Sequence, residues 1–397
     1  MIQNFIYNTP TRVVFGADTV KQAGALAKQF GATRVLLHYG SERVQKNGLM
    51  QAVREALDAE GITYVELGGV VPNPRLSKVY EGIELCRKEN VDFLIAVGGG
   101  SVVDSVKAIG YGLANEGDVW DFYDFKRLPK ACMPLGVILT IAAAGSEMSN
   151  SSVITKDSDS EYAGTKRGCN TELCRAKFAI MDPNLTMSLP EYQTMSGATD
   201  IMMHTLERYL SSGGHMDLTD ELAEGLLRTV MRNAKILLTD PSNYEARAEI
   251  MWASSLSHNG LTGCGTDGGD WACHRLEHEL GGLYDVAHGA GLAAVWGTWA
   301  RYVWKNDPAR FRKLSVKVLG IPDEGEDADV IEAGISAMED FFRSIHMPTS
   351  LRELGVDPTE EEFRLLAKNC AITAKNNLGS VRKLHEEDMD AIYRAAR

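Results

Sequence analysis

The hydrophobic and polar positions of the first 183 residues alternate between short apolar runs and longer amphipathic stretches. Apolar runs of strand length lie at residues 34–38, 63–67, 93–97 and 135–139. Apolar residues recur at the three- and four-residue spacing of a helix over residues 49–60, 76–89 and from residue 102 onward. This alternation of strands and helices predicts a doubly wound, mostly parallel sheet.

Beyond Leu189 the strand pattern disappears, and helical periodicity continues along the rest of the chain. Helices are expected at residues 190–211, 217–238, 243–259, 270–283, 288–305, 307–319, 328–346, 359–375 and 386–396. The dipeptides Asp182-Pro183 and Leu189-Pro190 separate the two patterns, because proline restricts the residue before it. The chain is therefore predicted to form an α/β domain over residues 1–185 and an all-helical domain over residues 186–397.

The composition is that of a globular protein long enough for two domains, with 397 residues, of which 44% are hydrophobic and 24% charged. A net charge of −13 argues against nucleic acid as the partner. Seven cysteines without a CxxC pair indicate free thiols in a reducing compartment. Neither a signal peptide nor an apolar run of bilayer length is apparent, so a cytoplasmic location without a membrane partner is expected.

A glycine-rich turn, Gly98 to Ser101, follows the apolar run at residues 93–97 and precedes a helix. Such turns let the backbone approach an anion, and the helix N-terminus supplies free N–H groups. The turn fits a pyrophosphate site and a merely tight connection about equally well, and it is neither a GxGxxG nor a Walker motif. Asp104 is either a first-turn acid or a contact to ribose or amide. The small residues from Thr140 to Glu147 fit a second close approach of the backbone to a ligand and a close strand-to-helix packing point about equally well.

Three histidines lie between Trp271 and Gly291. His274 and His278 are four residues apart and would share one face of a helix. The pair Gly281-Gly282 favours a turn that would bring His288 back towards His274.

Asp200 and His204 repeat the four-residue spacing in an earlier predicted helix. A lone pair at this spacing is more often structural than functional. One carboxylate together with two or three imidazoles from two helical segments is a reasonable shell for a divalent transition metal.

The order and spacing of these motifs resemble the iron-containing (group III) alcohol dehydrogenases, and among them the bacterial NAD(P)H-dependent butanol dehydrogenases, over essentially the whole chain. The resemblance rests on Phe15-Gly16, Val71 to Pro74, Gly98 to Ser101 with Asp104 and Lys107, Gly145 to Glu147, Asp182-Pro183, Asp200 with His204, and Trp271 to Gly291. It implies the dehydroquinate synthase-like fold of that family, with a dinucleotide-binding α/β domain, an all-helical metal-binding domain and a site between them.

The resemblance also assigns roles to individual residues. It makes Asp200, His204, His274 and His288 the ligands of one divalent ion, with Fe(II) favoured and Zn(II) an alternative. His278 corresponds to a catalytic histidine near the nicotinamide that does not bind the metal.

The implied cofactor is NAD or NADP. The positions that correspond to cofactor contacts are Gly40, Ser41, Asn73, Gly99, Gly100, Ser101, Asp104, Thr140 and Lys166. Two departures from the family pattern concern the cofactor. Ala144 stands where a threonine is usual, so one hydroxyl contact is missing. Ser41 and Arg43 would accept a 2′-phosphate whereas Glu42 would repel one, so the choice between NAD and NADP stays open.

The implied reaction is hydride transfer between a small, butanol-like primary alcohol and its aldehyde, with aldehyde reduction as the expected direction. The ion would polarise the substrate oxygen, and His278 would relay the proton. A homodimer is expected, with Phe5 to Thr9 as a segment that would pair across it. The alternative is a metal-dependent, non-redox lyase or cyclase on the same plan. That reaction needs basic residues near the metal, where the sequence offers Arg275 and few others.

Overall fold

A computed structural model describes residues 1–157, 164–375 and 377–397, and it divides the chain into two compact units. The α/β unit comprises Asn8–Ser188. The helical unit comprises Leu189–Arg397 together with the N-terminal segment Met1–Tyr7. The predicted domain limits are 1–185 and 186–397. The assignment of dinucleotide binding to the first domain and of metal binding to the second stays a prediction.

Six parallel strands form the sheet of the α/β unit, in the order β1-β8-β5-β4-β2-β3. They are β1 (Arg12–Phe15), β2 (Arg34–Tyr39), β3 (Thr63–Leu67), β4 (Phe93–Gly98), β5 (Leu135–Leu139) and β8 (Phe178–Met181). A separate antiparallel pair consists of β6 (Ser151–Thr155) and β7 (Lys166–Asn170). The predicted parallel sheet is confirmed.

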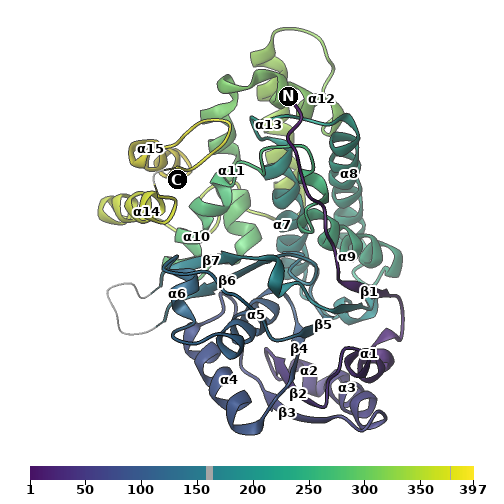
Figure 1. The fold of residues 1–397 in the computed structure, drawn as a ribbon. Helices are drawn as coiled ribbons and strands as arrows, with labels where there is room; N and C mark the ends of the chain where they lie inside the picture. The colour runs from purple at the N-terminus through teal and green to yellow at the C-terminus, as the bar shows by residue number, and fades with distance from the viewer. Residues whose placement is uncertain (158–163, 376) are drawn as a thin grey trace. The chain divides into compact units, whose positions relative to one another are not determined.

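Helices cover both faces of this sheet, which makes it doubly wound (Figure 1). They are α1 (Ala23–Gln29), α2 (Arg43–Lys46), α3 (Leu49–Asp58), α4 (Leu76–Glu89), α5 (Gly100–Ala114) and α6 (Trp120–Tyr123), with short 3-10 turns at η1 (Thr19–Gln22), η2 (Glu172–Cys174) and η3 (Pro183–Thr186). Val35 and Ile95 point into the core shared with α1 and α3. On the other face Gly82 of α4 packs against Ile109 of α5 and against Leu67 of β3.

The strand order reverses between β2 and β4. From β2 the chain moves outward to β3, and it then returns to β4 on the other side of β2 and continues to β5 and β8. Ligands of open parallel sheets bind beyond the carboxyl ends of the strands at such a switch point. Gly40 follows β2 and Gly99 follows β4, so two of the predicted cofactor positions lie there.

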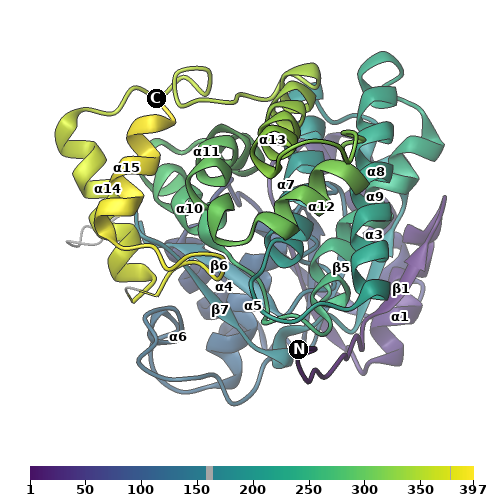
Figure 2. The same ribbon diagram turned by 90° about the horizontal axis from the view of Figure 1, so that it is seen from above.

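Nine longer helices build the described part of the helical unit. They are α7 (Glu191–Tyr209), α8 (Asp217–Thr239), α9 (Tyr244–His258), α10 (Ala272–Tyr284), α11 (His288–Val303), α12 (Pro308–Lys317), α13 (Asp327–Ser344), α14 (Glu360–Thr373) and α15 (Glu386–Ala395), with 3-10 turns at η4 (Leu261–Gly263) and η5 (Trp304–Asn306). Helix α11 packs against both α7 and α10 (Figure 2). These three helices carry all the predicted metal ligands.

The N-terminal segment makes no strand pairing within one chain over Phe5–Thr9, and the first strand begins at Arg12. The segment is tied to the helical unit, where the backbone N–H of Gln3 donates to the main-chain oxygen of Gly265 at 3.0 Å.

Within residues 1–157, 164–375 and 377–397, no helix combines the length and hydropathy that a bilayer crossing requires.

Candidate functional site

Helix α7 presents Asp200 and His204 one turn apart on a face that is buried. The Nδ1 atom of His204 donates to the main-chain oxygen of Asp200 at 3.0 Å and lies 3.1 Å from its Oδ1 atom. The main-chain bond fixes the orientation of the imidazole relative to the helix. Both side chains therefore face the same point inside the helical unit, as their four-residue spacing predicts.

Helices α10 and α11 bring His274 and His288 to the same carboxylate. The Nε2 atoms of His274 and His288 lie 3.8 Å and 3.7 Å from Oδ1 of Asp200. The turn that returns the chain is not at Gly281-Gly282, which lies inside α10. It begins at Asp285, which adopts a left-handed conformation with φ 53° and ends α10.

The donor atoms of this cluster fit a divalent metal ion. Ligand atoms of Asp200, His204 and His274 lie within 4.8 Å of one another. Oδ1 of Asp200 and Nε2 of His274 are buried and have no hydrogen-bond partner among the described residues. An orphaned buried polar atom costs about 1–3 kcal/mol, which a bound ion would offset. Imidazole nitrogens with one carboxylate oxygen suit Fe(II) and Zn(II).

The electrostatics of the cluster follow from burial and from mutual charge. Burial favours the neutral form of Asp200, but the charges of His204 and His288 outweigh it and hold the pKa well below its usual range. Burial lowers the pKa of His204 to about 4. Burial also acts to lower the pKa of His274, yet the neighbouring carboxylates of Asp200 and Glu207 raise the pKa to about 9. Metal binding at neutral pH would release the proton of His274, because ligands must be deprotonated.

Two buried glutamates stand beside the ligands, and the sequence interpretation did not include them. Oε1 of Glu207 accepts from Nδ1 of His274 at 3.1 Å, and Oε2 of Glu277 accepts from Nδ1 of His288. Their signal in the sequence is helical spacing, since Glu207 is three residues after His204 and Glu277 is three after His274.

His278 lies next to His288, with ring centroids 5.8 Å apart, and is half-buried. Its position beside the cluster suits a proton donor or acceptor. Together with Glu277 and His288 it forms a second group of donor atoms within 4.8 Å of one another.

A further layer of side chains surrounds His204 and His274. The ring centroid of His258 lies 4.1 Å from that of His204, and the ring centroid of Trp271 lies 5.4 Å from that of His274. Arg208 is buried beside them, with its guanidinium carbon 4.6 Å from the centre of the Trp271 ring. The sequence interpretation singled out Arg275 as the basic residue near the metal, whereas the structure adds Arg208. Its NH1 and NH2 groups already donate to the main-chain oxygen of His204 and to Nδ1 of His258.

The predicted pyrophosphate turn forms the start of α5. Gly99 is the N-cap in an extended conformation, and no side chain of the described residues caps the helix. The first N–H groups of a helix lack partners within the helix and are the usual anion site. A Cβ atom on Gly99 would lie 2.8 Å from Cβ of Ile141, and one on Gly100 would lie 3.3 Å from Cβ of Ala144. These glycines therefore permit tight packing, and pyrophosphate binding at the turn stays a prediction.

Asp104 and Lys107 tie α5 to the segment that follows β5. Oδ1 of Asp104 accepts from Oγ of Ser146 at 2.6 Å, and Oδ2 accepts from the backbone N–H of Val153 at 2.9 Å. Burial raises the pKa of Asp104. Nζ of Lys107 donates to the main-chain oxygens of Ser146, Ser149 and Ser151 at 2.7, 3.0 and 2.7 Å. Asp104 thus has a structural role, and its contact with the cofactor stays a prediction.

The other predicted cofactor residues lie on several loops and strands of the α/β unit. Gly40 lies near the start of α5, because a Cβ atom there would be 3.7 Å from Cγ2 of Val102. Thr140 is buried directly after β5, Lys166 is buried in β7, and Asn73 is buried in a left-handed conformation with φ 52°.

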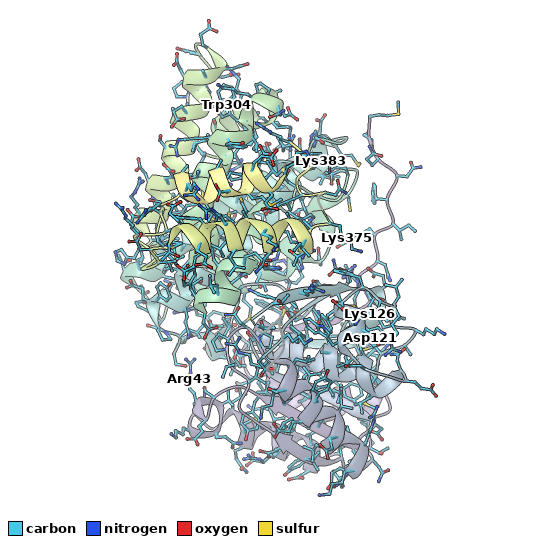
Figure 3. The ribbon with its side chains drawn as sticks, turned by 90° about the vertical axis from the view of Figure 1, so that its left-hand side faces the viewer. Arg43, Asp121, Lys126, Trp304, Lys375 and Lys383 are labelled. Atoms are coloured by element: carbon cyan, nitrogen blue, oxygen red, sulfur yellow. The ribbon has the colours of Figure 1, made fainter. Side chains whose placement is uncertain are left out.

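The loop after β2 contains the residues predicted to select between NAD and NADP. Ser41 is exposed. Arg43 begins α2 at the edge of the α/β unit (Figure 3), and its NH2 group donates to Oγ of Ser188 at 2.9 Å. Glu42 pairs with Lys46 at 3.0 Å. Both charged groups therefore have partners within the α/β unit, and the geometry favours neither cofactor.

Comparison with known proteins adds family information to this geometry. The model of the iron-containing alcohol dehydrogenases matches residues 10–183, and the model of the C-terminal part of that family matches residues 194–397. The chain is 37% identical over 393 residues to NADH-dependent butanol dehydrogenase A of Clostridium acetobutylicum, which covers 98% of this chain and 99% of that protein. It is 34% identical over 402 residues to the NADPH-dependent aldehyde reductase YqhD of Escherichia coli, with both chains covered completely.

A solved structure of NADH-dependent butanol dehydrogenase A from Thermotoga maritima superposes with a TM-score of 0.95 at 38% identity. The superposition covers 100% of this chain and 99% of that one.

Proposed function

The chain belongs to the iron-containing alcohol dehydrogenase family and is an oxidoreductase of the NAD(P)H-linked alcohol dehydrogenase and aldehyde reductase type; we propose that it interconverts small, butanol-like primary alcohols and their aldehydes. We further propose that it does so with one divalent ion, Fe(II) in preference to Zn(II). The names of the butanol dehydrogenases and of the aldehyde reductase support the substrate class. Aldehyde reduction is the proposed direction.

The observation that carries this proposal is the cluster of Asp200, His204, His274 and His288, with its two orphaned donor atoms. A divalent ion held there would supply Lewis-acid polarisation of the substrate oxygen. With four protein ligands, the ion would have to take up the substrate oxygen as a fifth ligand, an expansion that catalytic metal sites can undergo. His278 would hold or accept the proton of the substrate hydroxyl, because its imidazole lies beside the ligand His288 and can take either protonation state near neutral pH.

For the dinucleotide, we propose that residues 1–185 form the binding domain and that Gly99, Gly100 and Ser101 hold the pyrophosphate at the start of α5. Gly40 and Ser41 follow β2 on the other side of the switch point, which supports a place for them near the adenosine. Asn73, Asp104, Thr140 and Lys166 are proposed as further contacts. Residues 186–397 would form the metal-binding domain. When bound, the nicotinamide supplies the hydride chemistry.

We also propose that the protein is a homodimer and that it is located in the cytoplasm. Exposed apolar side chains of the N-terminal segment support an interface between copies, since Ile2, Phe5 and Ile6 are 56%, 49% and 95% exposed. Sedimentation equilibrium of the full chain and of a variant that begins at Asn8 would measure the contribution of this segment to association.

The non-redox lyase or cyclase is disfavoured by the bonds of Arg208, a buried basic residue beside the ligands. A substrate phosphate would need a cation with unused donors, and Arg208 already donates to His204, Ser257 and His258. The family models and the named relatives also place the chain among alcohol dehydrogenases.

The test is oxidation of NADH and of NADPH with butanal by one preparation, before and after chelation and after addition of Fe(II) or Zn(II). Activity that disappears with the chelator and returns with the metal is the expected result. The His274→Ala variant should lose metal and turnover while its dinucleotide Kd stays within about twofold of wild type. His346→Ala, which alters an exposed histidine paired with Glu191, is the control and should keep both. Turnover by metal-free protein would contradict the assignment.

A further inference from the structure

The glutamates behind the metal cluster are placed to control the ligand histidines. Building on the proposed function, we propose that Glu207 and Glu277 are positioning residues, which hold His274 and His288 in the tautomer whose Nε2 atom faces the metal and which increase the affinity of the site for a divalent cation. They act through the histidines and do not themselves bind the ion.

Glu207 fixes both the ring of His274 and the helix that carries it. Its Oε1 atom accepts from the backbone N–H of His274 at 3.0 Å and from Nδ1 of the same residue at 3.1 Å. Its main-chain oxygen accepts from the backbone N–H of Asp270 at 2.8 Å, just before α10 begins. Because Glu207 holds Nδ1, Nε2 is the nitrogen that points towards Oδ1 of Asp200, at 3.8 Å, and it would offer its lone pair to a bound ion.

Glu277, on α10, holds the ring of His288, which lies on the neighbouring α11. Its side chain is completely buried, and Oε2 accepts from Nδ1 of His288. Nε2 of His288 then faces Asp200 at 3.7 Å. Gly291, one turn into α11, leaves the space that this glutamate needs, because a Cβ atom there would lie 2.8 Å from Cγ of Glu277.

His204 provides the internal contrast. Its Nδ1 atom donates to the main-chain oxygen of Asp200 in its own helix, so a bond within α7 orients this ring. His274 and His288 come from other helices and receive a full negative charge behind each ring. A carboxylate hydrogen-bonded to a ligand histidine fixes the ring and raises its basicity. This role also explains why the protein buries the two carboxylates of Glu207 and Glu277, since burial of a carboxylate is otherwise unfavourable.

The test measures binding of Co(II) and Zn(II) to the full-length chain and to the variants Glu207→Gln and Glu277→Gln. Glutamine keeps the shape and a hydrogen-bond acceptor but removes the charge. Glu279→Gln is the matched control, because Glu279 is also a buried carboxylate on α10 and accepts from Oγ1 of Thr373 at 3.1 Å, away from the ligands. The readouts are the Kd from competition with a chromophoric chelator, the number of ions bound, the Co(II) absorption spectrum and the thermal midpoint of the metal-free protein.

Each Gln variant at the two proposed positions should bind Co(II) and Zn(II) roughly 10–100-fold more weakly than wild type and shift the Co(II) spectrum. Glu279→Gln should bind metal as wild type does, whatever the change in its metal-free midpoint. A lower metal-free midpoint with unchanged metal affinity would assign the glutamates a merely structural role and overturn the proposal. Two ions in wild type and one in Glu277→Gln would make Glu277 a ligand, which also overturns it. Wild-type protein that binds no metal would instead contradict the proposed function.

Discussion

Gly289 and the main-chain oxygen of Ser196 touch where α11 crosses α7: a Cβ atom on Gly289 would lie only 1.9 Å from that oxygen. Ser196 is one turn before Asp200 on α7, and Gly289 directly follows His288 on α11. The absent side chain therefore lets two backbones meet at the position where His288 reaches the carboxylate of Asp200.

Substituting Gly289 by Ala should push α11 away from α7, since the new methyl group meets backbone rather than a movable side chain. Overpacking of this kind costs about 1–3 kcal/mol, more than the roughly 1 kcal/mol that alanine contributes within a helix. Urea unfolding should show a net loss of stability, and Co(II) titration should show weaker binding. Gly225→Ala is the control, because Gly225 lies within α8 with nothing within 4 Å of a new Cβ atom. That variant should gain about 0.5–1 kcal/mol; equal behaviour of the two would contradict the packing argument.

Lys107→Met should destabilise the α/β unit strongly. The buried ammonium group donates to the main-chain oxygens of Ser146, Ser149 and Ser151 and lies near the carboxylate of Asp104 on the same helix. Removing one member of such a buried group typically costs about 3–5 kcal/mol. Urea unfolding measures this loss. Lys28→Met removes an exposed pair with Glu60 and should change stability by less than about 1 kcal/mol. A similarly small effect at Lys107 would show that the three main-chain oxygens find other donors.

Ser101→Asp separates dinucleotide binding from folding. A carboxylate in the first turn of α5 is favourable for the helix itself, because it faces the positive end of the dipole. The same charge repels a pyrophosphate, so the Kd for NADH should rise at least tenfold while the thermal midpoint stays the same or rises. Fluorescence titration with NADH measures the Kd. Ser101→Ala is the neutral comparison and should raise the Kd less. An unchanged Kd in Ser101→Asp would remove Ser101 from the pyrophosphate site.

His38 should make the α/β unit less stable in acid. It is buried between Leu67, whose main-chain oxygen is 2.7 Å from Nδ1, and Ser105, whose Oγ is 2.9 Å from Nε2. Burial lowers its pKa from 6.5 to about 4. Below pH 6.5 the unfolded chain takes up a proton that the folded chain refuses, so stability falls with decreasing pH until the folded group also titrates. The expected loss at pH 5, relative to pH 7.5, is about 2 kcal/mol.

The measurement is urea unfolding of metal-free wild type and of His38→Asn at pH 7.5 and pH 5. The loss attributed to His38 is the difference between the two proteins, since all other histidines are shared. Parallel pH profiles would show that the imidazole of His38 does not govern the acid sensitivity.

Local chemistry determined most of the elements and the ligand candidates of this protein. The predicted strands at residues 63–67 and 135–139 coincide with β3 and β5, and the predicted helix at residues 76–89 coincides with α4, because apolar periodicity reflects which face of an element is buried. Asp200 and His204 were recognisable together because four residues make one helical turn. The family resemblance added the assignment of His274 and His288 and the roles of the cofactor residues.

Contacts between distant segments were decided by the tertiary structure alone. Strands β1 and β8 have four residues each, too few for a periodic signal, and exist because each finds a partner in the sheet. The chain turns at Asp285 rather than at Gly281-Gly282, because packing extends α10 through both glycines. The carboxylate oxygens of Asp104 accept hydrogen bonds from Ser146 and Val153. These partners lie far along the chain, so no local pattern reveals them.

Glu207 and Glu277 show the same limit at the site itself. Their spacing places them on helix faces that bear ligands, but a glutamate at that spacing is usually exposed. Only the packing of α7, α10 and α11 buries each carboxylate against Nδ1 of a particular histidine. Helical spacing is a property of a few neighbouring residues, whereas the partner of a buried charge depends on which helices meet and at what separation. That separation is set in part by Gly289 and Gly291, where the missing side chains let the helices approach.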